Sequence, residues 1–196
     1  MWFLFINLEH PPVWSDNELK AIQSLSLAEL KPPPPDPTNL VANSAQAARF
    51  GHKLFFDEQL SITGTIACAS CHIPTQNFRD LLPKAIAIGE AERRTPSITG
   101  GAYSPWQYWD GRKDSQWSQA LAPLERPLEH GGNRTFYARY VLDKYKDEYE
   151  LIFGLGPDLS DIDRFPVHAG PLENLDWNSA WQKMTLQDRD SINRIF

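Results

Sequence analysis

The sequence predicts an all-α fold in which the helices are joined by long loops. Helix-capping residues followed by apolar residues at helical spacing recur along the chain. No segment shows the sustained alternation of Val, Ile and Thr that is typical of a sheet, and no internal repeat is present. A stretch rich in proline and glycine runs from Pro74 to Gly101. This stretch is longer than a simple connection between helices, and long structured loops often line functional sites.

The first part of the chain, residues 1–40, is expected to be an N-terminal helical extension with a Pro-rich connector. Ser15 and Glu18 fit a capping box, and the apolar residues that follow them predict a helix over 16–29. The proline run over 32–35 ends this helix and favours a stiff, extended connector.

The second part, residues 41–196, is expected to form the main domain. Its predicted helices span 44–56, 115–122, 134 to about 146, and 185–196, and Asp114 and Asn133 can cap the second and third of them. Pro123 is expected to end the helix over 115–122. The last helix reaches Phe196 with no Gly, Asn or Pro to stop it, which fits a truncated chain and a frayed terminal helix equally well.

Composition and charge exclude several classes of function. The 196 residues include 25 Asp and Glu against 19 Lys and Arg, a net charge of −6 that argues against a nucleic-acid or anionic-membrane surface. No stretch approaches the length of about 18 apolar residues that a membrane span needs. The apolar run that begins at Met1 has no basic residue before it, so it does not read as a signal peptide, and any export leader is missing.

The only two cysteines lie in the string Cys68-Ala69-Ser70-Cys71-His72, which has the C-x-x-C-H pattern of a c-type haem attachment site. Two thiols about one helical turn apart can form thioether bonds to the two vinyl groups of a haem. The next residue then places an imidazole under the iron, so His72 is the expected proximal metal ligand. The sequence therefore predicts one covalently bound haem c.

Three other interpretations of the two cysteines remain open. A zinc site would be incomplete, because the other four histidines are scattered and no second cysteine pair exists. A thioredoxin-like redox pair would need a βαβ context, which the segment over 61–66 is too short to supply. Ordinary buried cysteines would not explain His72.

Covalent haem is installed in an oxidising compartment, so a periplasmic location is expected.

The sixth position of the iron is not expected to carry a methionine. The chain has only Met1 and Met184, of which the first is terminal and the second lies in a polar segment 112 residues beyond His72. We therefore expect that position to be empty, or to hold water or another histidine.

Several ordered motifs carry a resemblance to a known family. They are Leu-Phe-Phe-Asp (54–57), C-x-x-C-H with Pro74, Arg-x-x-Pro (93–96), Trp-Asp-Gly-Arg (109–112), Gln-Ala-x-x-Pro (119–123) and Pro-Leu-Glu (127–129). The chain resembles the N-terminal, peroxidatic haem domain of the bacterial di-haem cytochrome c peroxidase family, which includes the tryptophan-tryptophylquinone maturation enzyme. The resemblance covers residues 45–135, and residues 185–196 more weakly. It implies a cytochrome c-like helical domain around the haem.

The resemblance also implies roles for individual residues. Trp109 would relay electrons between two haems, Gln119 and Glu129 would line the peroxide-binding face, and Pro123 would pack beside them. Chemistry agrees with this assignment, because heterolysis of a bound peroxide needs a base to move a proton from the inner oxygen to the departing one. A carboxylate beside a five-coordinate iron can do this, with an amide to orient the peroxide.

The chain departs from the family in two ways. Many members carry a histidine before Arg-x-x-Pro that blocks the peroxide site until reduction, whereas Ile86 lies near that place here. We therefore predict a pocket that is open without reductive activation, unless His130 swings in as a sixth ligand. The second C-x-x-C-H of the family is absent from this chain, and with it the second haem domain.

The leading hypothesis is a peroxidase-like oxidoreductase that reduces hydrogen peroxide to water with electrons from a small redox protein, either a cytochrome c or a cupredoxin. The resemblance leaves room for a homodimer. An alternative is a mono-haem electron-transfer cytochrome c without peroxidase activity, and a third is a relative that oxidises another substrate.

Overall fold

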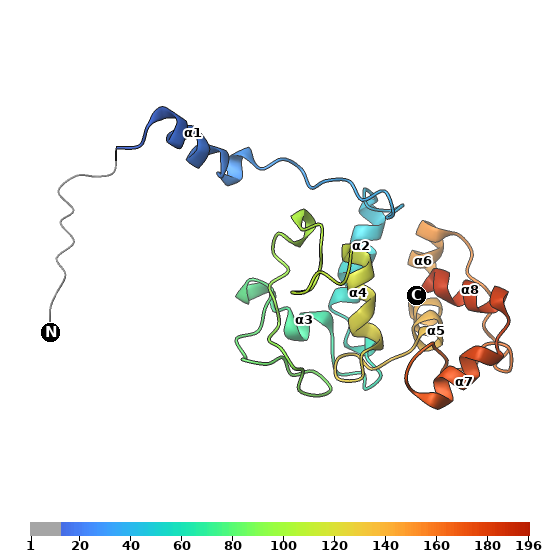
Figure 1. The fold of residues 1–196 in the computed structure, drawn as a ribbon. Helices are drawn as coiled ribbons and strands as arrows, with labels where there is room; N and C mark the ends of the chain where they lie inside the picture. The colour runs from blue at the N-terminus through green and yellow to red at the C-terminus, as the bar shows by residue number, and fades with distance from the viewer. Residues whose placement is uncertain (1–12) are drawn as a thin grey trace, which may run out of the picture. The chain divides into compact units, whose positions relative to one another are not determined.

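The structure is a computed structural model that describes residues 13–196 (Figure 1). The apolar run at Met1 and His10 lie outside the described residues. Within residues 13–196 there is no named strand, and only two isolated antiparallel bridges, Ile86 with Glu90 and Gln107 with Lys113. The all-α prediction is therefore confirmed. No helix of this range is long and apolar enough to cross a membrane.

The chain divides into two compact units, Met1–Pro34 and Pro35–Phe196. The domain boundary after residue 40 stays a prediction. In the first unit lies α1 (Asp16–Ser24), followed by a short 3-10 helix over Leu27–Glu29. The second unit holds α2 (Ala45–Phe55), α3 (Cys68–Cys71), α4 (Gln116–Glu125), α5 (Arg134–Lys144), α6 (Lys146–Phe153), α7 (Leu175–Lys183) and α8 (Leu186–Ile195).

The predicted helix over 16–29 is in fact two helices. The capping box is present: the Ser15 hydroxyl accepts the Glu18 N–H, and the Glu18 carboxylate accepts the Ser15 N–H. Two serines then interrupt the pattern. Ser24 Oγ donates to the Ala21 carbonyl at 2.7 Å, and Ser26 Oγ accepts from the next short helix as its N-cap. Serine side chains compete with helical hydrogen bonds in this way.

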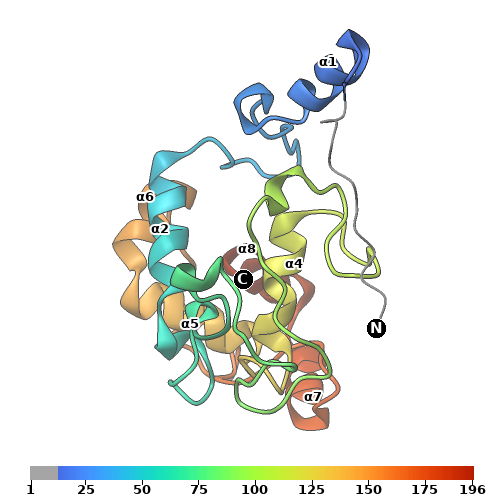
Figure 2. The same ribbon diagram turned by 90° about the vertical axis from the view of Figure 1, so that its left-hand side faces the viewer.

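Within the second unit, α4 separates two regions (Figures 1 and 2). The short helix α3 and the long loop over 74–115 lie on one side of it, and α5 to α8 lie on the other. Helix α5 packs against α6 and α8, while α2 packs against α6. The loop is therefore positioned by helices at both of its ends.

The hydrophobic core lies mainly among the C-terminal helices. One cluster of buried side chains consists of Ala138, Leu159, Phe165, Ala169, Trp181, Met184 and Ile192. A second cluster joins α2 to α5 and α6 through Phe50, Val141 and Tyr149. Met184 is only 5% exposed and belongs to the first of these clusters. The expectation that Met184 does not ligate iron stays a prediction.

Two predicted helix boundaries in the middle of the chain are wrong. Helix α4 is capped by Ser115 rather than Asp114, and it continues through Pro123 to Glu125. A proline in a helix removes one backbone hydrogen bond. That loss is tolerated here because Pro123 lies within one turn of the end of the helix, where backbone groups have few intrahelical partners.

The predicted helix from Arg134 to about residue 146 ends at Lys144, because Tyr145 leaves helical geometry at φ −126°. A new helix, α6, starts at once at Lys146. The Tyr145 hydroxyl donates to an Asp57 carboxylate oxygen at 2.7 Å, and this tertiary contact lies at the break between the two helices. Helix α7 was not predicted either, although Asn174 caps it.

Asp57, the last residue of Leu-Phe-Phe-Asp, is the centre of a polar cluster on α5. Its carboxylate accepts hydrogen bonds from the hydroxyls of Tyr140 (2.5 Å) and Tyr145 (2.7 Å) and from Lys144 Nζ (3.0 Å). Burial alone would raise the pKa of Asp57, but these hydrogen bonds together with that from the Gln59 N–H outweigh it and lower the pKa. The cluster therefore ties the chain before α3 to α5.

We expect Asp57→Asn to destabilise the fold by about 3 kcal/mol at neutral pH, because it removes a buried charge that three side chains contact. A lowered folded pKa means that the contribution is fully present above the unfolded Asp pKa of about 3.9. It is lost as the pH falls through the lower folded value. Urea unfolding at neutral and acidic pH should show the difference between the two proteins shrinking in acid.

Glu58→Gln is the matched control for this prediction, because Glu58 is the exposed neighbour of Asp57 and forms no ion pair within the described residues. Its unfolding free energy should stay within about 0.5 kcal/mol of the parent. An Asp57→Asn protein as stable as that control at neutral pH would contradict the assigned role.

Candidate haem and peroxide site

The C-x-x-C-H string forms a single helical turn, α3, and its two thiols are free. Ser70 Oγ accepts from the Ala67 N–H at 3.0 Å, and the His72 N–H donates to the Cys68 carbonyl at 2.9 Å. These bonds hold Cys68, Cys71 and His72 on one turn. The spacing therefore produces the local geometry that the sequence predicted.

The His72 ring is oriented by the loop that follows it. Its Nδ1 lies 3.0 Å from the Phe78 carbonyl oxygen, so Nδ1 carries the proton and donates to that oxygen. Asn77 and Phe78 both have positive φ, at 56° and 54°, which turns the chain back toward the ring. The bond leaves Nε2 as the unprotonated nitrogen, and this is the arrangement of a metal-ligating histidine.

Both thiols are partly buried and protonated at neutral pH. Burial, with smaller contributions from Cys71 and Glu129, raises the pKa of Cys68 to about 11. Burial also raises the pKa of Cys71, with smaller contributions from the charges of Asp80 and Glu129. Cys71 Sγ lies 3.7 Å from the Ile86 carbonyl oxygen. Ile86, the residue at the expected place of the blocking histidine, is therefore beside the attachment site.

His130 lies beside Cys68 and is only 3% exposed. Its Nδ1 is 3.2 Å from the Leu60 carbonyl oxygen, and its Nε2 is 3.8 Å from Cys68 Sγ. Burial lowers the pKa of this imidazole, although the bond to Leu60 and the charge of Glu129 partly oppose the shift. The ring is thus neutral and anchored by its Nδ1 proton. Its role as a sixth ligand stays a prediction.

Glu129 brings a carboxylate close to the haem-attachment cysteines. Glu129 directly precedes His130, whose Nε2 lies 3.8 Å from Cys68 Sγ, and its negative charge contributes to the raised pKa of both thiols. Arg126, three residues earlier, holds the carboxylate through an ion pair of 2.8 Å between Nη1 and Oε1. The side chain of Glu129 is 27% exposed, so the group is half-buried and accessible to a small molecule.

Gln119, on α4, and Glu129 both influence the phenol of Tyr108. Burial and then the Glu129 charge raise the pKa of this phenol, while Gln119 and the cations Arg112 and Arg126 oppose the shift. The Arg112 guanidinium stacks 3.5 Å from the centre of the Tyr108 ring. The amide and the carboxylate predicted to bind peroxide therefore share one neighbourhood.

Trp109 and Pro123, the two other residues predicted for the site, differ from Gln119 and Glu129 in their surroundings. The Trp109 side chain is 70% exposed, and its ring is covered on one face by the Arg93 guanidinium at 4.0 Å. No contact joins it to the two cysteines within the described residues. Pro123 is inside α4, and its carbonyl accepts from the His130 N–H at 3.2 Å. It thus acts through the backbone to position the segment that carries Glu129 and His130.

The residues around α3 fit a haem. Among the described residues, two buried polar atoms close to His72 in the chain have no hydrogen-bond partner, Gln76 Oε1 and Arg79 Nε. Buried polar groups are normally satisfied, and an arginine without a partner suits a carboxylate such as a haem propionate. Cys68 and Cys71 can bond the vinyl groups, and His72 Nε2 can bind the iron. The chain therefore offers a partner for the vinyl groups, the iron and a propionate of a haem.

Comparison with known proteins decides the family. The model of the family described as "Di-haem cytochrome c peroxidase" matches residues 45–169. The chain belongs to the di-haem cytochrome c peroxidase family. This membership confirms the resemblance, and the C-x-x-C-H string, Glu129 and Gln119 all lie within the matched range. The chain is therefore a member of a family of haem-binding oxidoreductases.

Individual relatives of this peroxidase family are similar over parts of the chain. Methylamine utilization protein MauG of Methylorubrum extorquens is 41% identical over 81 residues, 40% of this chain and 23% of that protein. Cytochrome c551 peroxidase of Nitrosomonas europaea is 26% identical over 157 residues, 77% of this chain and 46% of that protein. The chain thus spans less than half the length of these relatives.

Solved structures of the peroxidase family share the fold. A MauG-like protein associated with microbial copper homeostasis gives a TM-score of 0.56 at 27% identity, covering 63% of this chain and 38% of that one. The diheme peroxidase BthA of Burkholderia thailandensis gives a TM-score of 0.51 at 26% identity, covering 63% and 34%.

Several residues of the site were missed from the sequence. Asp80 is buried and accepts from Thr95 Oγ1 at 2.5 Å, so it links the loop after His72 to the Arg-x-x-Pro motif. Arg126 forms the ion pair with Glu129, and the phenol of Tyr108 is influenced by both Gln119 and Glu129. The only signal for Tyr108 and Arg126 was their position beside family motifs, at 109–112 and 127–129.

Proposed function

We propose that residues 41–196 form a peroxidatic haem domain that reduces hydrogen peroxide to water. One haem c would be held by Cys68 and Cys71, with His72 Nε2 as the proximal ligand. The observation that carries this proposal is the position of Glu129 directly before His130, whose Nε2 lies 3.8 Å from Cys68 Sγ, with the Glu129 carboxylate held by Arg126. An electron carrier needs no such group beside its haem.

The side chains have distinct tasks in this reaction. When bound, the haem supplies the iron at which the oxygen–oxygen bond of peroxide is cleaved. Glu129 takes the proton from the inner oxygen and returns it to the departing one, which leaves as water. The Gln119 amide orients the peroxide. With two electrons and two further protons, each peroxide gives two waters.

The electrons would come from a small redox protein, a cytochrome c or a cupredoxin. Trp109 is the proposed relay, since its ring is exposed and an adjacent cation, Arg93, covers one face. A periplasmic location is proposed because covalent haem attachment belongs to oxidising compartments. Whether the protein forms a homodimer is to be measured as its size in solution.

The spin state of the ferric iron separates this proposal from a mono-haem electron carrier. We expect electron paramagnetic resonance of the holoprotein to show a high-spin ferric signal, because Ile86 replaces a ligating side chain and His130 is anchored at Leu60. A low-spin, bis-histidine signal that disappears in His130→Gln would show that His130 closes the site. A low-spin signal that persists in that variant would favour the carrier.

A further inference from the structure

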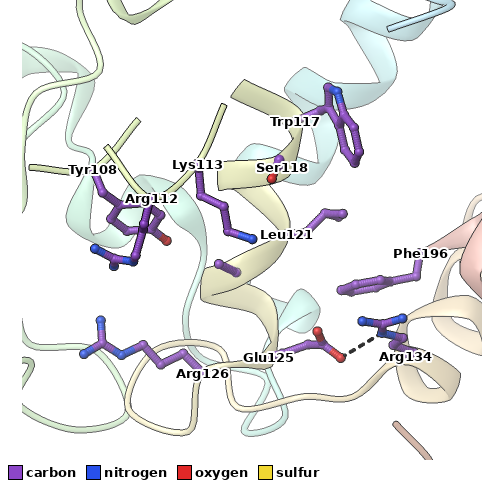
Figure 3. A pocket seen from close by; sticks show the side chains of 11 residues that line it. Tyr108, Arg112, Lys113, Trp117, Ser118, Leu121, Glu125, Arg126, Arg134 and Phe196 are labelled. Carbon is purple, nitrogen blue, oxygen red and sulfur yellow. Dashed lines mark hydrogen bonds and ion pairs between the residues drawn. The ribbon is translucent and has the colours of Figure 1, made fainter. Parts of the chain in front are cut away.

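A cavity of about 450 Å³ lies beside α4, and Gln119 is not among the residues that line it (Figure 3). Cys68, Cys71 and His72 do not line it. Trp117, Leu121 and Phe196 supply apolar surface on one side of α4, and Tyr108 lies on the other side. This volume is in the range of small-molecule sites, and aromatic walls are typical of them. The cavity is therefore separate from the proposed haem site.

The charge of this cavity is opposite to that of the protein as a whole. The chain carries a net charge of −6, yet the side chains that line the cavity include a single carboxylate, Glu125, and four cations. These are Arg112, Lys113, Arg126 and Arg134. Positive charge is thus concentrated against aromatic surface in a protein that is otherwise acidic.

The four cations differ in whether they are already neutralised. The three guanidiniums each form an ion pair with a carboxylate of the chain, at N–O distances of 2.7, 2.8 and 3.2 Å. The ammonium of Lys113 has no hydrogen-bond or ion-pair partner within residues 13–196. Figure 3 shows its side chain extending along α4 toward Leu121. A half-buried ammonium with no counter-charge is a natural partner for an anion.

We propose that this cavity binds a small aromatic carboxylate. The carboxylate would pair with Lys113, and the ring would lie against Trp117 and Leu121, facing Phe196. A simple inorganic anion would leave the aromatic walls unused, and a neutral aromatic molecule would leave the ammonium without a counter-charge. Only a ligand with both parts uses all of the surface that the cavity offers.

The cavity also adjoins the groups proposed to act on peroxide. Arg126 lines the cavity and pairs with Glu129, and Tyr108, which also lines it, is influenced by Gln119 and Glu129. Binding can nevertheless be measured without peroxide and without turnover. Failure of the peroxidase proposal and failure of this one are therefore distinguishable.

The test uses the haem-loaded chain and benzoate as the probe, followed by isothermal titration calorimetry. We expect saturable binding with a Kd of about 1 mM or tighter. Benzamide, which lacks the charge, and acetate, which lacks the ring, should each bind at least about tenfold more weakly. Equal binding of acetate and benzoate would overturn the proposal, because it would show charge attraction alone.

Lys113→Gln should weaken benzoate binding by at least about tenfold, since it removes the one unpaired cation of the cavity. Lys183→Gln is the matched control, because Lys183 is an exposed lysine at the end of α7 and does not line the cavity. The control should leave the Kd unchanged. Unchanged binding in Lys113→Gln, or no saturable binding of benzoate to the parent chain up to about 20 mM, would overturn the proposal.

Discussion

A chain in which Cys68 and Cys71 are both replaced by alanine is expected to carry no covalently attached haem. Both thiols lie on the single turn of α3, and the described residues contain no other cysteine that could replace them. Thioether attachment to the haem vinyl groups requires these sulfurs. Haem staining after denaturing electrophoresis should fall from one haem per chain to background.

The single variants Cys68→Ala and Cys71→Ala serve as internal controls. Each keeps one thiol on the same turn, so each should retain haem through one thioether bond and show a shifted pyridine haemochrome band. Ala69→Ser, which changes the string without touching either thiol or His72, should keep full attachment. Covalent haem in the double variant would contradict the assignment of this site.

Glu129→Gln is expected to slow cleavage of bound peroxide by about 10²-fold or more, which is the range for loss of a positioned general base. The amide keeps the size of the side chain and can still contact Arg126, but it cannot carry the proton between the two oxygens. The rate is measured by rapid mixing of the ferric holoprotein with peroxide, followed in the Soret band.

Glu125→Gln provides a control of the same chemistry four residues away. Glu125 also pairs with an arginine, Arg134 at 3.2 Å, but it is the last residue of α4 and is not adjacent to His130 in the chain. Its rate should stay within about twofold of the parent, whereas loss of a catalytic base costs far more. Equal rates for Glu129→Gln and the parent would remove Glu129 from the mechanism.

Helices could be predicted from the sequence where a local cap defines them. Ser44, Asn133 and Thr185 each accept a backbone N–H of the first turn, so α2, α5 and α8 begin where expected. Boundaries that depend on distant residues could not be predicted. The break at Tyr145 involves Asp57, which is 88 residues away in the chain.

The attachment site was also readable in advance, because C-x-x-C-H requires residues that are adjacent in sequence. The groups that orient it were not. The Phe78 carbonyl reaches His72 only because two non-glycine residues adopt positive φ, and no sequence pattern at Asn77 and Phe78 announces this. Likewise, the position of Tyr108 beside the residues of α4 depends on how the long loop folds back onto that helix.

The cavity beside α4 shows a further limit of sequence reasoning. Lys113 and Trp117 are four residues apart in the chain, and nothing in the sequence around them indicates that they line a cavity. Arg134 and Phe196 complete the cavity from helices that pack only in the folded chain. The concentration of positive charge thus arises from tertiary structure and leaves no run of basic residues in the sequence.

The most direct test of the account is rapid mixing of the ferric, haem-loaded chain with a small excess of hydrogen peroxide. The account predicts a fast change in the Soret band with loss of the high-spin signal, followed by return to the ferric spectrum when a reduced small cytochrome c or cupredoxin is added. A spectrum that stays low-spin and does not respond to peroxide would contradict a peroxidatic site and leave an electron carrier.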